Sequence, residues 1–532
     1  MTYSLEDTTD GCYGSLTEGS SVTIVGGGPG GVAAALYLQK ERPDLDINVL
    51  EYRDERKSLI PACGSCKGGA GVMPGQVLST LEEDLDISLP DQLIMNRYSG
   101  YDFHRLGAEK SYSMSMSTAE VMPEPDKDYG TVSVYRGNGP ARFSGDEAIG
   151  FDAYLRKEAK DRGISFTYGS VNDIIVPESL DGKVMVNYKQ VGKNDDLTFA
   201  TDLVINAAGA KGSQLTRMGY TDNDGALQSR DRGISPRTRT FGQFEIKLPK
   251  EDVESYFGDT ISVYTGLPGS DFVAVTPKFP GPQKVKGKDG STNEVDYGYL
   301  SLTLALDPKK ERELDKLGSK NEVRRAYADQ LKGLEKALLE HPGFSYKITN
   351  RIEDRPFHCI CQPSAPVSAS EKPFEDRYVE IGDAGGAIRY GKNGIGHSIL
   401  SAKSAVESIL ERGVSEEGFR EGYYTDFVKP LDRDNAVGKT MFGANRFLAG
   451  NDILSGLFYG TANSPVGKPI KKMVYRMARG HFGEDSYKSI VGNAIGDAVK
   501  LPFELAGNGI RSAVDKYNDW RERHDSDEEP ES

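Results

Sequence analysis

The sequence is poor in the features that mark secreted, membrane-spanning and nucleic-acid-binding proteins. Its 532 residues include five cysteines, which are too few and too clustered for a secreted disulfide framework. The first twenty residues are polar and acidic without an apolar signal region, and no run approaches the roughly 18 apolar residues of a membrane span. The net charge of −15 argues against a general nucleic-acid binder, which needs a basic surface. We therefore expect a cytoplasmic protein without a nucleic-acid partner.

A chain of this length exceeds the usual limit of a single hydrophobic core, so several domains are expected. The stretch "SVTIVGGGPGGVAAALYLQKERPDLDINVLEYR" predicts a strand over 22–25, a glycine turn, a helix over 33–39 and a second strand over 46–50. This order is that of a βαβ unit. A helix followed by a short strand is predicted over 151–169, and strands that lead into glycines or a helix are predicted near 201–210 and 378–412. This alternation indicates an α/β domain of Rossmann type.

The region between these segments has a different pattern. "TFGQFEIKLP", "ISVYTGL", "FVAVTPKFPGP" and "DYGYLSLTLAL" alternate with period two, as strands of a half-exposed antiparallel sheet do. "NEVRRAYADQLKGLEKALLE", residues 321–340, predicts an amphipathic helix. The fold class predicted is α/β, with a Rossmann-like domain, an inserted antiparallel-sheet substrate domain and a C-terminal helical region. The expected divisions are a flexible leader over 1–20, a discontinuous nucleotide-binding domain over 21–225 and 350–430, a substrate domain over 226–349 that takes further strands from about 85–140, C-terminal helices over 431–520 and an acidic tail over 521–532.

A dinucleotide site is predicted at the first glycine turn. Gly26, Gly28 and Gly31 form G-x-G-x-x-G between a strand and a helix, where the glycines permit a tight turn, close approach to a pyrophosphate and helix–strand packing. Glu51 closes the second strand 20 residues after Gly31, where a carboxylate binds the adenosine ribose. Gly30 lies within the same turn. A glycine turn without ligand would leave Glu51 without a role.

A second glycine cluster favours FAD over NAD. "EIGDAGG" places Asp383 at the end of a late strand, where its carboxylate can bind the hydroxyls of a longer cofactor arm. Gly394 and Gly396 then begin a helix whose N-terminus can stabilise negative charge on a flavin. The cofactor-binding residues predicted from both clusters are Gly26, Gly28, Gly30, Gly31, Glu51, Gly209, Gly382, Asp383, Gly394, Ile395 and Gly396.

These motifs resemble the geranylgeranyl reductase-like flavoproteins, which share the p-hydroxybenzoate hydroxylase-type FAD fold. The resemblance is carried over residues 20–410 by "VGGGPGG" with Glu51, "FDAYLRKEAKDRGISF", "DLVINAAGAKGS", "VEIGDAGGAIRYGKNGIGHSI" and "DFVAVTPKFPG" followed by "YGYLSLTLAL". It implies extended FAD and reduction of C=C bonds in an isoprenoid or quinone-like substrate by hydride transfer from flavin N5. The electron donor would be reduced ferredoxin or NAD(P)H.

The chain departs from related flavoproteins at two points. Aromatic hydroxylases carry Ala-Asp-Gly where this chain has Ala207-Ala208-Gly209, which disfavours a direct NAD(P)H-driven hydroxylase. The arginine that precedes the "FD" helix in the family is absent, and Arg136 and Arg142 are the candidates to replace it.

Cys63 and Cys66, in "PACGSCKGG", and Cys359 and Cys361, in "FHCICQP", fall where the family's chain passes near the flavin. Three interpretations stay open: unconnected reduced thiols, a flavin-linked dithiol, and a four-thiolate metal site. The first is favoured, so no metal is expected. "PACG" resembles a family loop, which makes Cys63 the first candidate for a catalytic residue facing substrate, with Cys66 the second.

Three further features carry predictions. His397, Tyr390 and Lys392 flank the second glycine cluster, and each is either near the flavin or an ordinary surface residue. Around 468–480 the chain predicts a basic amphipathic helix, which either contacts a membrane surface or packs on the protein body. The function expected is an FAD-dependent oxidoreductase for a hydrophobic small molecule. The alternatives are a flavin–dithiol enzyme or electron carrier, and a flavoprotein with structural FAD that docks on a membrane or protein assembly.

Overall fold

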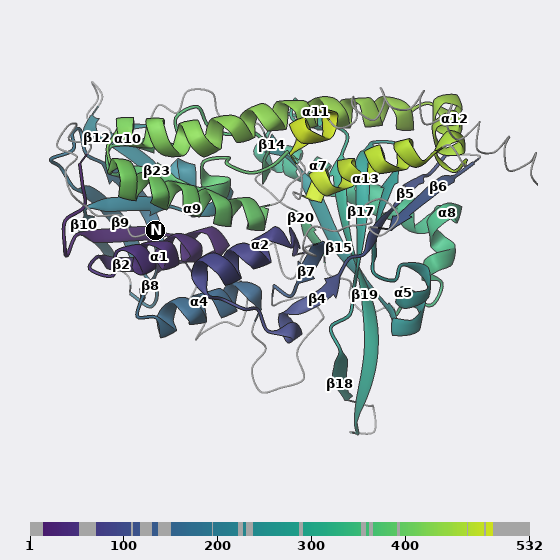
Figure 1. Cartoon of the computed structure of the whole chain (residues 1–532), viewed down its shortest axis with the longest axis horizontal. Coiled ribbons are helices and arrows are strands. Elements are labelled where there is room, and N and C mark those ends of the chain that lie inside the picture. The colour runs from purple at the N-terminus through teal and green to yellow at the C-terminus, as the bar shows by residue number, and fades with distance from the viewer. Residues whose placement is uncertain are drawn as a thin grey trace, which may run out of the picture.

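The structure is a computed structural model that describes residues 14–52, 71–107, 110–117, 130–136, 150–193, 195–221, 227–229, 238–286, 291–352, 358–360, 365–390, 394–464, 467–482 and 486–492. Two sheets dominate it, with a long helix that passes over both (Figure 1).

The first sheet is parallel at its centre. Its strand order is β10-β9-β8-β2-β1-β11-β23-β22, and β8, β2, β1, β11 and β23 run parallel. The bounds are β1 Ser21–Val25, β2 Asp46–Glu51, β8 Ser165–Val176, β9 Val184–Gln190, β10 Asp196–Thr201, β11 Leu203–Asn206, β22 Phe374–Glu375 and β23 Tyr378–Glu380. β12 (Thr216–Thr221) pairs in parallel with β8, and β13 (Leu227–Ser229) pairs with β12.

Apolar side chains alternate between the two faces of this sheet. Val22, Ile24 and Val49 point to the face that packs under helices α1 (Pro29–Glu41), α4 (Phe151–Asp161) and α9 (Gly394–Arg412). Val25 and Leu50 point to the other face, where β8 and β9 curl over and supply Ile174, Val176, Val184 and Val186. Both faces are therefore covered, as in other parallel sheets.

The second sheet is mostly antiparallel, in the order β20-β15-β19-β17-β16-β5-β6. Its strands are β5 Gly100–Arg105, β6 Tyr112–Ser117, β15 Phe241–Pro249, β16 Thr260–Thr265, β17 Ser270–Lys278, β19 Thr292–Leu306 and β20 His358–Ile360. β18 (Pro282–Lys286) forms with β19 the hairpin that projects from the molecule in Figure 1. One face packs against α5 (Lys250–Tyr256), α7 (Lys320–Glu340) and α8 (Pro342–Ser345), around Leu300, Leu302, Leu304 and Leu306.

Smaller elements join the two sheets. β3 (Val72–Pro74), β7 (Thr131–Val134) and β4 (Ile94–Arg97) form a short antiparallel sheet, and β14 (Thr238–Arg239) pairs with β21 (Ala365–Pro366). Short helices complete the connections: α2 Gln76–Ser79, η1 Thr80–Asp84, η2 Asp91–Leu93, η3 Gly209–Leu215, α6 Pro308–Leu314, η4 Tyr346–Ile348 and η5 Gly382–Ala384.

The C-terminal part is helical, as predicted. α10 (Glu416–Phe419) and η6 (Arg420–Val428) lead into the long α11 (Lys429–Ala449), which runs from the parallel sheet to the second sheet (Figure 1). α12 (Asp452–Ala462) and α13 (Lys468–Phe482) then turn back over the face of the second sheet opposite α7, where Tyr459, Val474 and Tyr475 pack against Tyr101 and its neighbours.

The predicted strand–turn–helix–strand unit and the helix over 321–340 are confirmed, as is the fold class. The structure lengthens the first helix to Pro29–Glu41 because Pro29 and the glycines continue the helical turn. Within the described ranges, no helix combines the length and apolar character needed to cross a membrane. The expected domain boundaries stay predictions.

Candidate functional site

The predicted cofactor residues lie where β1, β2, β11 and β23 end. The backbone N–H of Ala207 donates to the carbonyl of Val25 at 2.8 Å, and that of Ile381 donates to the carbonyl of Asn206 at 3.0 Å. The chain therefore leaves three adjacent parallel strands at the same level. Ligands of open α/β sheets bind beyond this edge, at the carboxyl ends of the strands. Both glycine clusters, far apart in the sequence, meet there.

Two glycines of the first turn are required by close backbone contacts. Gly26 has φ +106°, and a β-carbon there would lie 2.6 Å from the carbonyl oxygen of Ala207. A β-carbon on Gly31 would lie 1.9 Å from the carbonyl oxygen of Gly26. Both distances are far shorter than van der Waals contact, so Gly26 and Gly31 allow α1 to begin directly over the end of β1.

Gly28 differs from its neighbours because it faces open space. It is the N-cap of α1, with extended backbone, and a β-carbon there would meet no described heavy atom within 4 Å beyond its immediate chain neighbours. No described side chain caps α1. The first backbone N–H groups of a helix lack intrahelical partners and attract anions. The turn therefore offers room and donors for a phosphate group beside Gly28.

Gly30 has a packing role. A β-carbon on Gly30 would lie 2.9 Å from both the β-carbon and the carbonyl oxygen of Ser398 in α9. A β-carbon on Gly382, at the second cluster, would also lie 2.9 Å from the β-carbon of Ser398. Glycine at both positions thus allows the start of α1 and the turn after β23 to close on the first turns of α9.

Glu51 is buried at the end of β2 and binds the glycine turn. Its Oε2 accepts a hydrogen bond from the backbone N–H of Gly27 at 2.6 Å. Arg156, buried on α4, donates from Nη1 to the carbonyl of Gly27 at 3.0 Å. The carboxylate is thus held beside the turn, at the position that the sequence predicts for binding the adenosine ribose.

Arg156 is a site residue that the sequence reasoning missed. It lies in the "FDAYLRKEAKDRG" helix, whose apolar spacing predicted the helix but gave no sign that one arginine points inward. Arg136, a candidate for the missing family arginine, is bound to Asp152 in the first turn of the same helix, with Nη2–Oδ2 at 2.6 Å and Nε–Oδ1 at 3.0 Å. Arg142 lies outside the described residues.

The second cluster faces the first across the same edge. Gly382 has φ +56° and begins the turn that carries Asp383. A β-carbon on Gly394 would lie 3.5 Å from Oδ1 of Asp383, so this carboxylate lies beside the start of α9. Gly209, with φ +71°, begins the η3 turn after β11, which packs against η5. An acidic group and a helix N-terminus therefore occupy the positions predicted for binding a longer cofactor arm.

The first turn of α9 is largely interior. Ile395 and Gly396 are buried, and His397 is 6% exposed, so His397 is not the helix-surface residue that the sequence also allowed. Ser401, one turn further, accepts a hydrogen bond from the backbone N–H of Gly382 at 3.0 Å. These contacts fix the start of α9 against the turn that carries Asp383.

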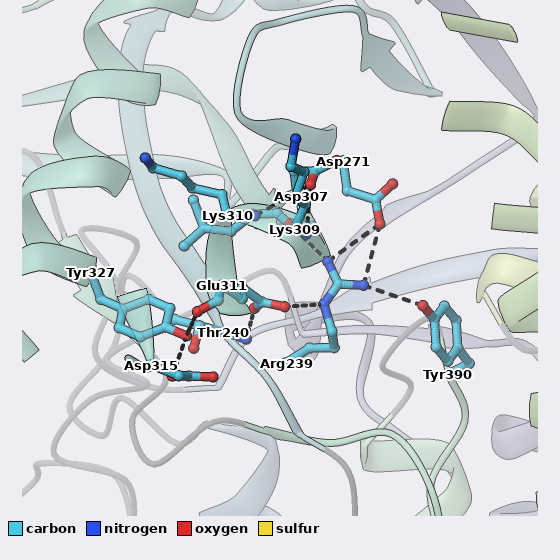
Figure 2. A network of polar contacts seen from close by, with 12 residues as sticks. Arg239, Thr240, Asp271, Asp307, Lys309, Lys310, Glu311, Asp315, Tyr327 and Tyr390 are labelled. Atoms are coloured by element: carbon cyan, nitrogen blue, oxygen red, sulfur yellow. Dashed lines mark hydrogen bonds and ion pairs between the residues drawn. The ribbon is translucent and has the colours of Figure 1, made fainter. Parts of the chain in front are cut away.

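Tyr390 joins a buried polar network centred on Arg239 of β14 (Figure 2). The guanidinium of Arg239 contacts Glu311 at 2.6 Å, Asp271 at 3.3 Å and the hydroxyl of Tyr390 at 3.4 Å. Arg446, from α11, binds Asp271 from the other side at 3.0 Å. Burial raises the pKa of Asp271 and of Glu311, and the guanidinium of Arg239 opposes both shifts.

The loop that carries Tyr390 is also held by α11. The side-chain oxygen of Asn435 accepts from the backbone N–H of Tyr390 at 2.7 Å, and its amide nitrogen donates to the carbonyl of Ile388 at 2.8 Å. Asp434 forms an ion pair with Arg389 at 3.2 Å. Residues 388–390, which follow the second glycine turn, are therefore bound by residues more than forty positions away.

The cysteine predictions stay open. Cys63, Cys66 and Cys361 lie outside the described residues, as does Lys392, and for Cys359 the structure describes the backbone pairing with Gln243 in β20. Within the described part of the chain, no three His, Cys, Asp or Glu side chains gather in a way that could hold a metal ion.

No protein-family model and no curated protein sequence matches the chain. Solved structures do match its fold. The flavin-dependent halogenase CmlS superposes with a TM-score of 0.52 at 17% identity, over 91% of this chain and 78% of the halogenase. A flavoprotein/dehydrogenase from Cytophaga hutchinsonii gives a TM-score of 0.52 at 15% identity, over 87% of this chain and 93% of the other. The chain therefore shares the fold of these flavoproteins, while its resemblance to geranylgeranyl reductases stays a prediction.

Proposed function

We propose that this protein is an FAD-dependent oxidoreductase. The observation that carries the proposal is the open turn at Gly28, beside the uncapped start of α1, with the carboxylate of Glu51 held next to it. The space beside Gly26 and Gly31 is filled by the protein's own backbone, whereas the space beside Gly28 is open to a ligand. The fold shared with two flavoproteins supports the same assignment.

Each end of the site suits a different part of FAD. The N–H groups at the start of α1 would bind the pyrophosphate, and Glu51 would accept hydrogen bonds from the adenosine ribose. Asp383 would accept hydrogen bonds from hydroxyls of the ribityl chain, and the start of α9 would place positive partial charge near the flavin ring. When bound, FAD would supply hydride-transfer chemistry, which no amino-acid side chain provides.

The spectrum of the purified protein tests the cofactor. We expect a yellow protein with about one non-covalent FAD per chain, identified after heat release, since the fold presents one such site. Glu51→Ala should lose FAD, while Glu158→Ala, at a half-buried position of α4 that pairs with Arg162, should retain it. Thermal unfolding of both apo-proteins separates loss of the cofactor from loss of the fold. A colourless protein that binds NAD more tightly than FAD would overturn the proposal.

For the substrate, we propose a hydrophobic small molecule of isoprenoid or quinone-like chemistry, reduced at a C=C bond. The support is the sequence resemblance to geranylgeranyl reductase-like flavoproteins. The direct experiment is to extract and identify the lipid or quinone that co-purifies, then to measure its reduction anaerobically with NAD(P)H or reduced ferredoxin as donor. Product that carries an added oxygen or halogen atom, formed only in air, would contradict a reductase.

Anaerobic titration separates the proposed reductase from a flavin–dithiol enzyme. A dithiol linked to the flavin would raise the uptake to about four electrons per FAD, because flavin and disulfide each accept two. The reductase takes up about two, and Cys63→Ser then keeps FAD but turns over substrate slowly. A protein whose bound FAD cannot be reduced by any donor would instead have a structural cofactor.

A further inference from the structure

An apolar surface is exposed at the end of the C-terminal helices. Four large apolar side chains form what we call the α12 patch: Phe447 is 71% exposed, Ile453 82%, Leu454 37% and Leu457 68%. Phe447 lies in the last turn of α11, and the other three lie on α12. Large contiguous apolar surfaces on soluble proteins mark contact with another protein or with a membrane.

The patch stands on a well-anchored helix. Ser455, Tyr459 and Ala462, on the inner side of α12, are buried, and Tyr459 stacks on Tyr112 of β6 with ring centroids 6.0 Å apart. The side chain of Asn451 caps α12 by accepting from the N–H of Leu454 at 3.0 Å. The inner face of α12 therefore packs on the protein, and the exposed apolar side chains of its outer face lack an apolar environment among the described residues.

A further anchor fixes the corner between α11 and α12. Arg105, buried at the end of β5, donates from Nε to the carbonyl of Ala449 at 3.0 Å and pairs with Asp452. Asp452 is the acidic residue of α12, and its charge is therefore compensated by the second sheet. The corner leaves the exposed side of α12 without net negative charge.

The segment that begins at the α12 patch and continues through α13 is basic in sequence. From Ile453 to Gly483 the sequence has no Asp or Glu, although the whole chain carries a net charge of −15. Lys468, Lys471 and Lys472 lie in the first turns of α13, which follows α12 after a short connection, and none of the three forms an ion pair with another described residue. Positive charge next to an apolar surface favours an anionic partner.

The apolar side of α13 itself is covered. Val474, Tyr475 and Ala478 are buried against the second sheet, and Ile470 and Met473 pack on the same core. The helix therefore packs on the protein body, as one of the two sequence interpretations had it, and the exposed apolar surface belongs to α12.

We propose that the α12 patch docks on the surface of a lipid bilayer that contains anionic lipids. α12 lies at one extremity of the molecule, across the end of α11 (Figure 1). A second copy of the chain is a poorer partner, because contact through this surface would bring the lysines of both copies together. The proposal is independent of the bound cofactor.

Co-sedimentation of the full-length protein with vesicles tests this proposal. We expect binding to phosphatidylcholine vesicles that contain phosphatidylglycerol, weaker binding to phosphatidylcholine alone, and release by salt. Ile453→Ser/Leu457→Ser should lower the partition coefficient roughly tenfold or more, because two large side chains no longer enter the lipid. Lys471→Gln/Lys472→Gln should lower binding to vesicles that contain phosphatidylglycerol and leave binding to pure phosphatidylcholine vesicles unchanged. Leu317→Ser, at an exposed leucine between α6 and α7, is the matched control and should bind as the parent does.

Three results would overturn the proposal. The first is a parent protein that fails to bind anionic vesicles, as expected if another segment of the chain covers the patch. The second is an Ile453→Ser/Leu457→Ser variant that binds as tightly as the parent. The third is a parent that forms dimers in solution which the same variant abolishes, since the occupant would then be a second copy. Thermal unfolding confirms that each variant is folded.

Discussion

Gly28 and Gly31, in the first glycine turn, should respond differently to the same substitution. Gly28 faces open space in the described structure, with φ −77°, a value open to any residue. Alanine there should lower the unfolding free energy of the apo-protein by less than about 1 kcal/mol, the usual loss from a poorer N-cap. Alanine at Gly31 adds a helix former, worth about 1 kcal/mol, but its β-carbon would lie 1.9 Å from the carbonyl oxygen of Gly26. The clash should win, at a net cost of about 3 kcal/mol or more.

Cofactor binding should show the reverse order of effects. A methyl group at Gly28 would occupy the space beside the first N–H groups of α1 and displace a phosphate from them. Loss of one hydrogen bond to a charged group costs about 1.5–3 kcal/mol. The dissociation constant of FAD should therefore rise roughly 10- to 100-fold in Gly28→Ala.

Two assays on the apo-protein measure these effects: urea unfolding for stability, and titration with FAD followed by quenching of flavin fluorescence. The expected pattern is a stable Gly28→Ala that binds FAD poorly and a Gly31→Ala that is poorly folded. A Gly28→Ala protein with unchanged FAD affinity would refute the assignment of the open turn to the phosphates. A Gly31→Ala protein as stable as the parent would refute the packing argument.

Three further predictions concern single side chains. Asp383→Ala should raise the FAD dissociation constant about tenfold by the same titration, without changing apo-protein stability, since it removes hydrogen bonds to the cofactor. Asp271→Asn should lower the unfolding free energy in urea by about 3–5 kcal/mol, because the buried Arg239 and the partly exposed Arg446 lose their shared anion, while the exposed-pair control Asp161→Asn should change it by less than about 1 kcal/mol. Burial lowers the pKa of His104, stacked on Tyr264, to about 3. The unfolded chain binds this proton below a pH of about 6.5, so stability should fall as pH drops from there toward 3, by at most about 1.4 kcal/mol per pH unit, and His104→Phe should flatten this slope in urea unfolding at several pH values.

The local parts of the fold could be predicted because the information lies within a few residues. The β-branched strand 22–25, the glycine turn and the second strand ending at Glu51 follow from patterns of two to four residues, and the structure places them as expected. The helix over 321–340 is equally local: Ser319 and Glu322 form a capping box at its start. These local patterns predict the structure correctly because the local conformational preference of each segment agrees with its tertiary packing.

Contacts between distant segments could not be predicted in this way. The approach of Gly30 to Ser398 depends on how α1 and α9 cross, and the inward position of Arg156 depends on the turn that it meets. β5 pairs in parallel with β16, although period-two alternation alone favoured an antiparallel arrangement throughout. Helix periodicity could not predict the α12 patch, because apolar residues such as Ile453 and Leu457 are usually core residues. Only the structure shows that other residues of α12 fill its inner face.

The C-terminal helices take part in the candidate site although the sequence assigned them a separate region. Asn435 on α11 binds the backbone on both sides of Arg389, at Ile388 and Tyr390. Arg446 on the same helix pairs with Asp271, which shares Arg239 with Tyr390. At its far end the same helix leads to the α12 patch. Because α11 is a continuous helix with one end near the candidate cofactor site and the other at the α12 patch, the distance between the site and the patch is fixed. Docking through the patch would therefore hold the site at a constant height above the bilayer, which suits an enzyme whose substrate is drawn from the lipid.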